Sequence, residues 1–257
     1  MYAEIFLGII IPFVGTVAGA LCVFFMKNEL NNSFKIAISG FAGGVMIAAS
    51  VWSLLIPAIE YNSSISLGWF SSLPAVMGLW LGVLFLLLSD RLLPEPHFNA
   101  VPSYTEKNRM LFLSVSLHNL PEGMAVGVVY ASLLSSGSTE GFSGALALSL
   151  GIAVQNFPEG AIISLPLANE GVKKSKAFLA GVLSGVIEPI GGALTILALS
   201  LVLPVLPGLL GFAAGAMIYA VIKELMPVIA SESGGNTGIL SFTTGFSIMM
   251  ILDIVLG

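Results

Sequence analysis

The sequence predicts an all-α integral membrane protein with eight transmembrane helices in one bundle and both termini outside. Three observations predict this class. Of the 257 residues, 56% are hydrophobic and only 9% are charged, whereas a soluble domain carries about 25% charged residues. The apolar residues gather in eight runs, each long enough to cross a hydrocarbon core of about 30 Å at 1.5 Å per residue. The basic residues are concentrated at alternate connections between those runs.

The eight apolar runs form a single transmembrane domain, 1–257. They cover residues 5–26, 34–59, 69–93, 110–134, 142–168, 177–203, 206–230 and 236–256. The division between the sixth and seventh runs depends on Pro204 and Pro207, because proline interrupts a helix. The longest connection, 94–108, contains His97 and two prolines, and we expect it to be irregular.

Topology follows from the nine Lys and Arg residues. Eight flank or fill the first, third and fifth connections: Lys27, Lys35, Arg91, Lys107, Arg109, Lys173, Lys174 and Lys176. The second, fourth and sixth connections contain no Lys or Arg. By the positive-inside rule, the odd connections are cytoplasmic and both termini face outward.

Two related motifs lie in consecutive apolar runs. His118-Asn-Leu-Pro-Glu122-Gly is followed 37 residues later by Gln155-Asn-Phe-Pro-Glu159-Gly. Each motif puts a candidate ligand at position i and a carboxylate at i+4, so both project from one face of a helix. Each also places a proline between them, which frees a backbone carbonyl one turn earlier.

A third carboxylate, Glu188, lies in the sixth run beside Pro189. Counted from the cytoplasmic ends of their runs at 1.5 Å per residue, all three carboxylates lie near the middle of the bilayer. A charged carboxylate there costs at least about 2.5–3.5 kcal/mol, so such residues are functional by default. Three ionised carboxylates at one depth repel one another unless a cation lies between them.

The polar residues at this depth suit a divalent first-row cation. His118, Asn119, Glu122, Gln155, Asn156, Glu159 and Glu188 together offer one imidazole, three amide oxygens and six carboxylate oxygens. This donor set suits zinc, and also iron, manganese or cobalt. It is mostly oxygen and has more than four members, which favours an ion in transit over a tight structural zinc site.

Other interpretations of these residues stay open. Helices kinked by proline can bury protonated carboxylates that bond only to Asn119 and Asn156. The same acids can carry protons without metal, as a proton-coupled carrier or a proton channel. An enzyme is not expected, because the His-Glu-x-x-His pattern of an intramembrane metal hydrolase is absent from the sequence. We also expect no nucleic-acid partner, because the chain has no basic patch.

At these motifs the chain resembles the ZIP (Zrt/Irt-like) family of divalent metal transporters, and in particular its GufA-like prokaryotic branch. The resemblance covers all eight runs. It is strongest in the two proline motifs and in Glu188-Pro-Ile-Gly-Gly, and it extends to Gly43–Ser50 and to Glu224-Leu-Met-Pro227.

The resemblance implies a binuclear metal site on the fourth, fifth and sixth helices. One position would use Met46, His118, Glu122, Gln155 and Glu159, and the other Asn119, Glu122, Asn156, Glu159 and Glu188. The family moves divalent metal toward the cytoplasm, and an elevator-like motion of one helix group against the other has been proposed for it. Gln155 stands where a histidine is common.

These expectations define cargo, partners and location. Zinc is the expected substrate, with iron, manganese, cobalt and cadmium as alternatives, and no cofactor acts as a catalyst. The partners are metal ions and the lipid bilayer, and a homodimer is left open. We expect a multi-pass protein of a plasma membrane, and specifically a prokaryotic inner membrane. The roles of Glu224, Asp253 and His97 are also left open.

Overall fold

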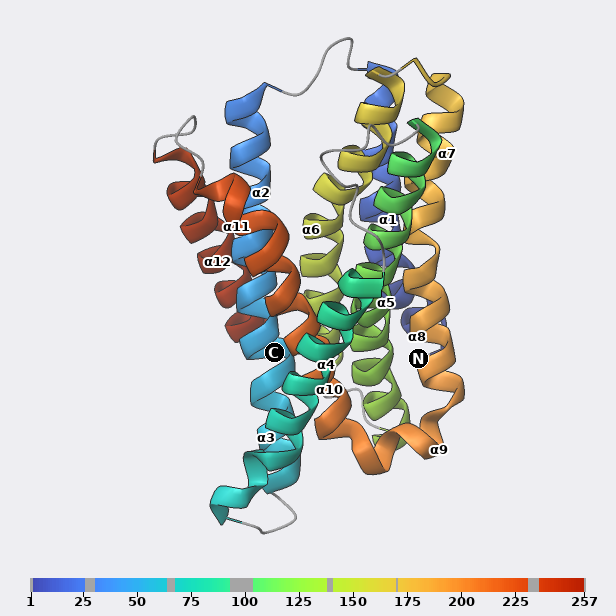
Figure 1. Cartoon of the computed structure of the whole chain (residues 1–257). Helices are drawn as coiled ribbons and strands as arrows, with labels where there is room; N and C mark the ends of the chain where they lie inside the picture. The colour runs from blue at the N-terminus through green and yellow to red at the C-terminus, as the bar shows by residue number, and fades with distance from the viewer. Residues whose placement is uncertain are drawn as a thin grey trace.

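The computed structural model is built entirely of helices in the part of the chain that it describes, residues 2–25, 31–63, 68–92, 104–137, 141–169, 171–230 and 236–256. The chain passes through the bundle eight times (Figure 1). The prediction of an all-α membrane protein is therefore confirmed.

The first four passes take up the N-terminal half. They consist of α1 (Tyr2–Phe25); α2 (Asn32–Ala49), the π-helical turn η1 (Ser50–Leu55) and α3 (Ile56–Ser63); the 3-10 turn η2 (Gly68–Ser72) and α4 (Leu73–Leu92); and α5 (Tyr104–Ser136).

The last four passes consist of α6 (Phe142–Asn169); α7 (Lys174–Gly185) and α8 (Ile187–Leu197); α10 (Leu206–Ala220), the π-helical turn η4 (Val221–Leu225) and α11 (Met226–Ile229); and α12 (Thr237–Leu256). The short helix α9 (Leu199–Val202) and the 3-10 turn η3 (Leu203–Val205) reverse the chain between the sixth and seventh passes.

Seven of the eight passes are long and apolar enough to cross a membrane. The remaining pass, α5, has 33 residues and carries the polar block from His118 to Glu122, which lowers its apolar character. The interpretation of 94–108 as irregular is wrong for residues 104–108, which form the start of α5. In the sequence, Ser103-x-x-Glu106 is a pattern typical of a helix N-terminus, and it favours a helix start in this region. Residues 94–103, with His97, lie outside the described ranges.

Four pairs of helices make the most extensive contacts: α1 with α6, α2 with α12, α4 with α10, and α5 with α8. Glycine brings each pair together, because a residue without a side chain lets two backbones touch. Gly15 lies against the backbone of Ala153 in the first pair, and Gly82 lies against that of Phe212 in the third. Most of the glycines whose surroundings the structure describes thus serve as contact points between helices.

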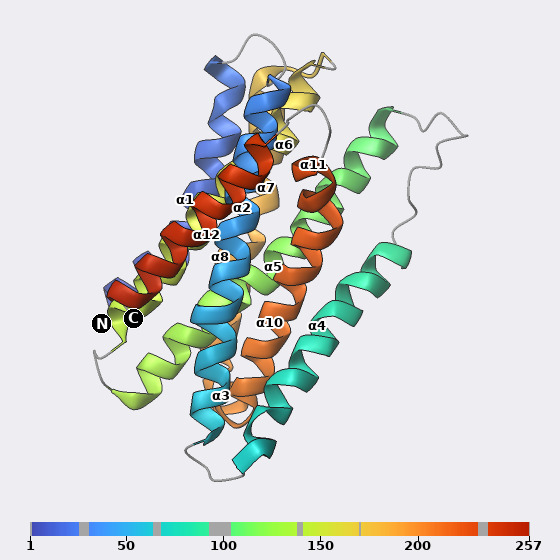
Figure 2. The same cartoon turned by 90° about the vertical axis from the view of Figure 1, so that its left-hand side faces the viewer.

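The four pairs form two groups of helices. α1 and α6 pack with α5, α7 and α8, whereas α2 and α12 pack with α10 and α11, with α4 on the far side of α10 (Figures 1 and 2). The N-terminal ends of α2 and α7, which carry Lys35 and Lys174, lie at the same end of the bundle, at the top of Figure 1. This agrees with the predicted placement of the basic connections on one side.

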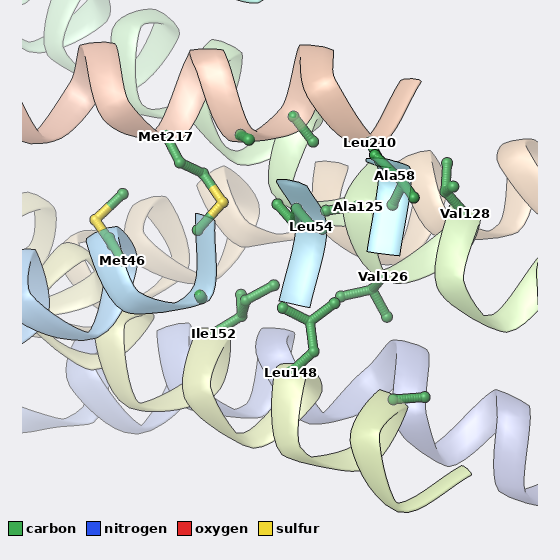
Figure 3. Packing of buried hydrophobic residues seen from close by; sticks show 14 of the residues in the cluster. Met46, Leu54, Ala58, Ala125, Val126, Val128, Leu148, Ile152, Leu210 and Met217 are labelled. Carbon is green, nitrogen blue, oxygen red and sulfur yellow. The ribbon is translucent and has the colours of Figure 1, made fainter. Parts of the chain in front are cut away.

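A cluster of buried apolar side chains joins the two groups (Figure 3). Leu54 and Met217 come from one group, and Val126, Leu148 and Ile152 come from the other. The apolar cluster forms a large part of the contact between the groups. Asn119 and Asn156 of the two proline motifs lie within the first group, where both donate to Glu188 on α8.

Candidate metal centre

Three helices present the predicted ligands to one region of the bundle. Asn119 and Glu122 lie on α5, Gln155 and Asn156 lie on α6, and Glu188 lies in the first turn of α8. All five side chains are buried; Glu122 is 2% exposed and Glu188 is 1% exposed. Such burial of carboxylates requires polar partners close by.

The position of Glu188 follows from a break in the sixth pass. Pro189 has no backbone N–H and cannot donate to the carbonyl of Gly185, four residues earlier. α7 ends at Gly185, and α8 begins at Ile187. Across the break, the backbone N–H of Val186 donates to the carbonyl of Leu183 at 3.3 Å, a shorter loop than in an α-helix. Glu188 therefore begins a new helix and points into the first helix group.

The carboxylate of Glu188 is the centre of a hydrogen-bond network from three other helices. Its Oε1 accepts from Thr16 Oγ1 at 2.8 Å and from Asn119 Nδ2 at 3.2 Å, and its Oε2 accepts from Asn156 Nδ2 at 2.7 Å. Asn119 Nδ2 also donates to the backbone carbonyl of Ser184 at 3.2 Å. The network ties α1, α5 and α6 to the N-terminus of α8.

A second contact joins the two proline motifs directly. Gln155 Nε2 donates to Oε1 of Glu122 at 2.9 Å. In this pair, as in the Glu188 network, the amide nitrogen faces the carboxylate. The i and i+4 spacing predicted that the two motifs could converge on one point, and this contact between α5 and α6 brings two of their residues together.

Three amide oxygens are left over by this arrangement. Asn119 Oδ1, Gln155 Oε1 and Asn156 Oδ1 are buried and have no hydrogen-bond partner among the residues that the structure describes. A buried oxygen without a partner costs about 1–3 kcal/mol. A divalent cation is a suitable partner for such oxygens, and carboxylate oxygens beside them add negative charge.

The remaining predicted ligands are placed differently. Glu159 is half-buried and lies near enough to Glu188 for their charges to interact. Met46 lies on α2, in the other helix group, 2% exposed and packed within the apolar cluster (Figure 3). His118 is part of α5, next to Asn119, but its side chain is outside what the structure describes. Over the described ranges, no three His, Cys, Asp or Glu side chains form a group able to hold a metal ion.

Sequence reasoning missed Thr16, which is fully buried and donates to Glu188. One signal could have found it. Thr16 is the only hydroxyl residue in the first apolar run, 5–26, where it stands between Gly15 and the glycine at position 19. A lone hydroxyl on a helix face rich in glycine is well placed to reach a polar group on a neighbouring helix.

One residue whose role was left open, Asp253, belongs to a separate place. Its Oδ1 accepts a hydrogen bond from Ser53 Oγ at 2.6 Å, and both residues line a cavity of about 390 Å³ with Glu60. This cavity lies between the two helix groups, with walls from η1, α3, α5, α6, α10 and α12. Glu224 is part of the π-helical turn η4, and its side chain is not described.

Comparison with known proteins agrees with this combination of fold and motifs. The family model described as ZIP zinc transporter matches residues 100–253. The chain is 34% identical to zinc transporter ZIP11 of Xenopus tropicalis, over 98% of this chain and 96% of that protein. It is also 34% identical to zinc transporter GufA of Myxococcus xanthus, over 93% of both chains, and to zinc transporter ZIPB of Bordetella bronchiseptica, over 95% of this chain and 79% of that one. The chain therefore belongs to the ZIP family of zinc transporters, a family of multi-pass membrane proteins and not of enzymes.

Proposed function

We propose that this protein carries divalent transition-metal ions, zinc foremost, into the cytoplasm through an intramembrane site on α5, α6 and α8. The observation that carries the proposal is a set of three amide oxygens that lie beside buried carboxylates and have no hydrogen-bond partner among the described residues. Amide and carboxylate oxygens suit an ion that must bind and leave, because they hold zinc less tightly than four Cys or His ligands do. The inward direction rests on the family resemblance, and the distribution of Lys and Arg indicates only which end of the bundle is cytoplasmic.

We propose that the site holds two metal ions. One position uses Met46, His118, Glu122, Gln155 and Glu159, and the other uses Asn119, Glu122, Asn156, Glu159 and Glu188. Glu122 and Glu159 are common to both sets and would bridge the ions. The contact of Gln155 with Glu122 and the network around Glu188 support two neighbouring subsites, because each gathers a different group of these residues.

Burial makes a bound cation favourable here. Glu122 and Glu188 are almost completely removed from solvent, and in such surroundings an attraction between opposite charges is screened much less than in water. The same surroundings make an empty, fully ionised site costly. A cation relieves this cost, and the competing occupant is a proton, which is why a proton carrier is the alternative to be tested.

We further propose that the whole chain acts as one transporter domain in a plasma membrane, in a prokaryote its inner membrane. The two helix groups pack through an apolar contact surface, and the ligands of α5, α6 and α8 belong to one of them. Prokaryotic relatives such as the Myxococcus and Bordetella proteins support this location.

The test is uptake of zinc, iron(II), manganese, cobalt and cadmium into proteoliposomes, with Glu122→Ala beside the wild type. Glu4→Ala is the control, because Glu4 is an exposed carboxylate in the first turn of α1. We expect saturable uptake by the wild type and by the control, and at least a hundredfold loss in Glu122→Ala. Wild-type uptake by a correctly inserted Glu122→Ala protein would contradict the shared site. A proton flux without metal uptake, removed by the same substitution, would establish the proton carrier instead.

A further inference from the structure

We infer that Thr16 is a positioning residue for the metal centre: its hydroxyl fixes the Glu188 carboxylate, which in turn aims the amide oxygens of Asn119 and Asn156 at the cation. The inference rests on the proposed function, since it names what holds one of the two proposed subsites in place. Thr16 comes from α1, which contributes none of the predicted ligands. Its role is to orient other residues and not to bind metal itself.

The hydrogen bond of Thr16 differs from those of other threonines in the bundle. Thr195, Thr243 and Thr244 each donate to the backbone carbonyl four residues earlier in their own helices, as threonine commonly does in a helix. Thr16 instead donates to Glu188 Oε1 at 2.8 Å, across a sequence separation of 172 residues. The Thr16 hydroxyl is fully buried and donates to a carboxylate of the site, where the usual acceptor would be a carbonyl of its own helix. We take this as the sign of a positioning role.

Backbone contacts on two sides fix the place of Thr16. A Cβ atom on Gly185 would lie 2.8 Å from Thr16 Cγ2 and 3.1 Å from its Oγ1, so the threonine side chain occupies the space of that missing side chain. Gly160, on α6, packs against the Thr16 backbone carbonyl. Thr16 is therefore held between α6 and the break that separates α7 from α8.

Thr16, Asn119 and Asn156 all donate to the Glu188 carboxylate, so the Thr16 hydroxyl affects how the two amides are oriented. Oε1 accepts from Thr16 and from Asn119, and the bond from Thr16 is the shorter by 0.4 Å, at 2.8 Å against 3.2 Å. With Oε1 held on that side, Oε2 meets Asn156 Nδ2 at 2.7 Å. Both amide nitrogens are then directed at Glu188, so the opposite ends of the amides, their oxygens, are the atoms left for a cation. Loss of the hydroxyl leaves Asn119 alone to orient Oε1.

The geometry confines the effect to one subsite. Thr16 donates to Glu188, whereas Gln155 donates to Glu122, the carboxylate of the other motif contact. Hydrogen-bond partners behind a metal ligand are typically worth about 10-fold to 100-fold in metal affinity. We therefore expect Thr16→Val to raise the Kd for zinc at the subsite of Asn119, Asn156 and Glu188 by about tenfold or more, with the KM for uptake rising in parallel.

The experiment measures zinc binding by titration calorimetry on the full chain in nanodiscs, the zinc-dependent rise in Tm, and initial rates of zinc uptake into proteoliposomes. Thr16→Val and Thr16→Ala remove the hydroxyl, the first at nearly constant volume and the second without added bulk. Thr16→Ser keeps the hydroxyl and removes only the methyl group. Thr195→Val is the matched control, because it deletes a buried threonine hydroxyl bonded only to the backbone of its own helix.

We expect weakened zinc binding and a smaller zinc-dependent rise in Tm in both variants that lack the hydroxyl, and values within about twofold of wild type in Thr16→Ser and Thr195→Val. Unchanged zinc affinity in a folded Thr16→Val or Thr16→Ala protein overturns the inference, as does an equal loss in Thr195→Val or Thr16→Ser. If these results appear while Glu122→Ala is inactive, the proposed transport function stands and this inference alone fails. If the wild type neither binds nor transports zinc, both fail.

Discussion

Replacement of Gly123 by alanine tests whether the close contact between α5 and α8 positions the metal centre. A Cβ atom on Gly123 would lie 2.7 Å from Cα of Glu188 and 2.8 Å from its carbonyl carbon. These are backbone atoms, so no change of rotamer relieves the overlap. The carbonyl oxygen of Glu188 would be closer still. Ordinary contacts begin at 3.4 Å, and α5 and α8 must therefore separate locally by at least about 0.7 Å.

This separation has a calculable effect on Glu188. If the separation of at least about 0.7 Å falls along the bond from Asn119 Nδ2 to Glu188 Oε1, that bond lengthens from 3.2 Å to about 3.9 Å or more, outside hydrogen-bond range. Overpacking costs about 1–3 kcal/mol, against a gain of about 1 kcal/mol from the higher helix propensity of alanine. Loss of a hydrogen bond to a carboxylate is worth about 1.5–3 kcal/mol, which corresponds to roughly 10-fold to 100-fold in zinc affinity.

The assay compares the KM for zinc uptake and the thermal unfolding of Gly123→Ala with those of Gly208→Ala. Gly208 lies in α10, and a Cβ atom there would come no closer than 3.7 Å to its nearest neighbour, the carbonyl oxygen of Pro74. We expect a higher KM and a lower Tm for Gly123→Ala, and neither change for Gly208→Ala. A Gly123→Ala protein at least as stable as wild type, with unchanged KM, would refute the reasoning, since helix propensity alone predicts stabilisation.

Two further substitutions address metal selectivity and the cavity that Asp253 lines. Gln155→His puts an imidazole nitrogen beside Glu122, and we expect zinc to be preferred over manganese more strongly, measured by competitive uptake; an unchanged selectivity series would remove Gln155 from the ligands. Asp253→Asn removes a negative charge from the cavity lined by Ser53 and Glu60, and we expect KM to rise by up to about tenfold, with the maximal rate nearly constant, in initial-rate assays. An unchanged KM would show that ions do not pass this cavity.

The candidate ligands could be predicted from the sequence, because charged and polar side chains inside an apolar run are costly in lipid and therefore stand out. Carboxylates inside apolar runs, together with neighbouring prolines, identified the candidate ligands on α5 and α6 and Glu188 on α8. The break before α8 was not predicted. The contact of Gln155 with Glu122 follows the predicted convergence of the two motifs. Met46 marks the limit of this reasoning, because a methionine among small apolar residues carries no polar signal and its buried place in the apolar cluster came from the fold.

The ends of helices were harder to predict where two local sequence signals disagree. α5 begins at Tyr104. The sequence predicts an irregular segment there, because prolines lie in the same stretch. The two π-helical turns, η1 and η4, were not predicted, although each ends two residues before a proline, Pro57 or Pro227, which cannot donate a backbone hydrogen bond. A π-helical turn is a local rearrangement of backbone hydrogen bonds, stabilised by surrounding contacts.

The sequence by itself determined that this chain is an all-helical membrane protein and places acids where acids are costly, because hydropathy and charge act on each segment separately. Only the tertiary structure decided which helices pair, which group holds the ligands, and which way each amide faces. These depend on contacts between residues far apart in the chain, such as Thr16 with Glu188. A glycine allows another helix to pack closely at its position, but the sequence does not show which helix that is.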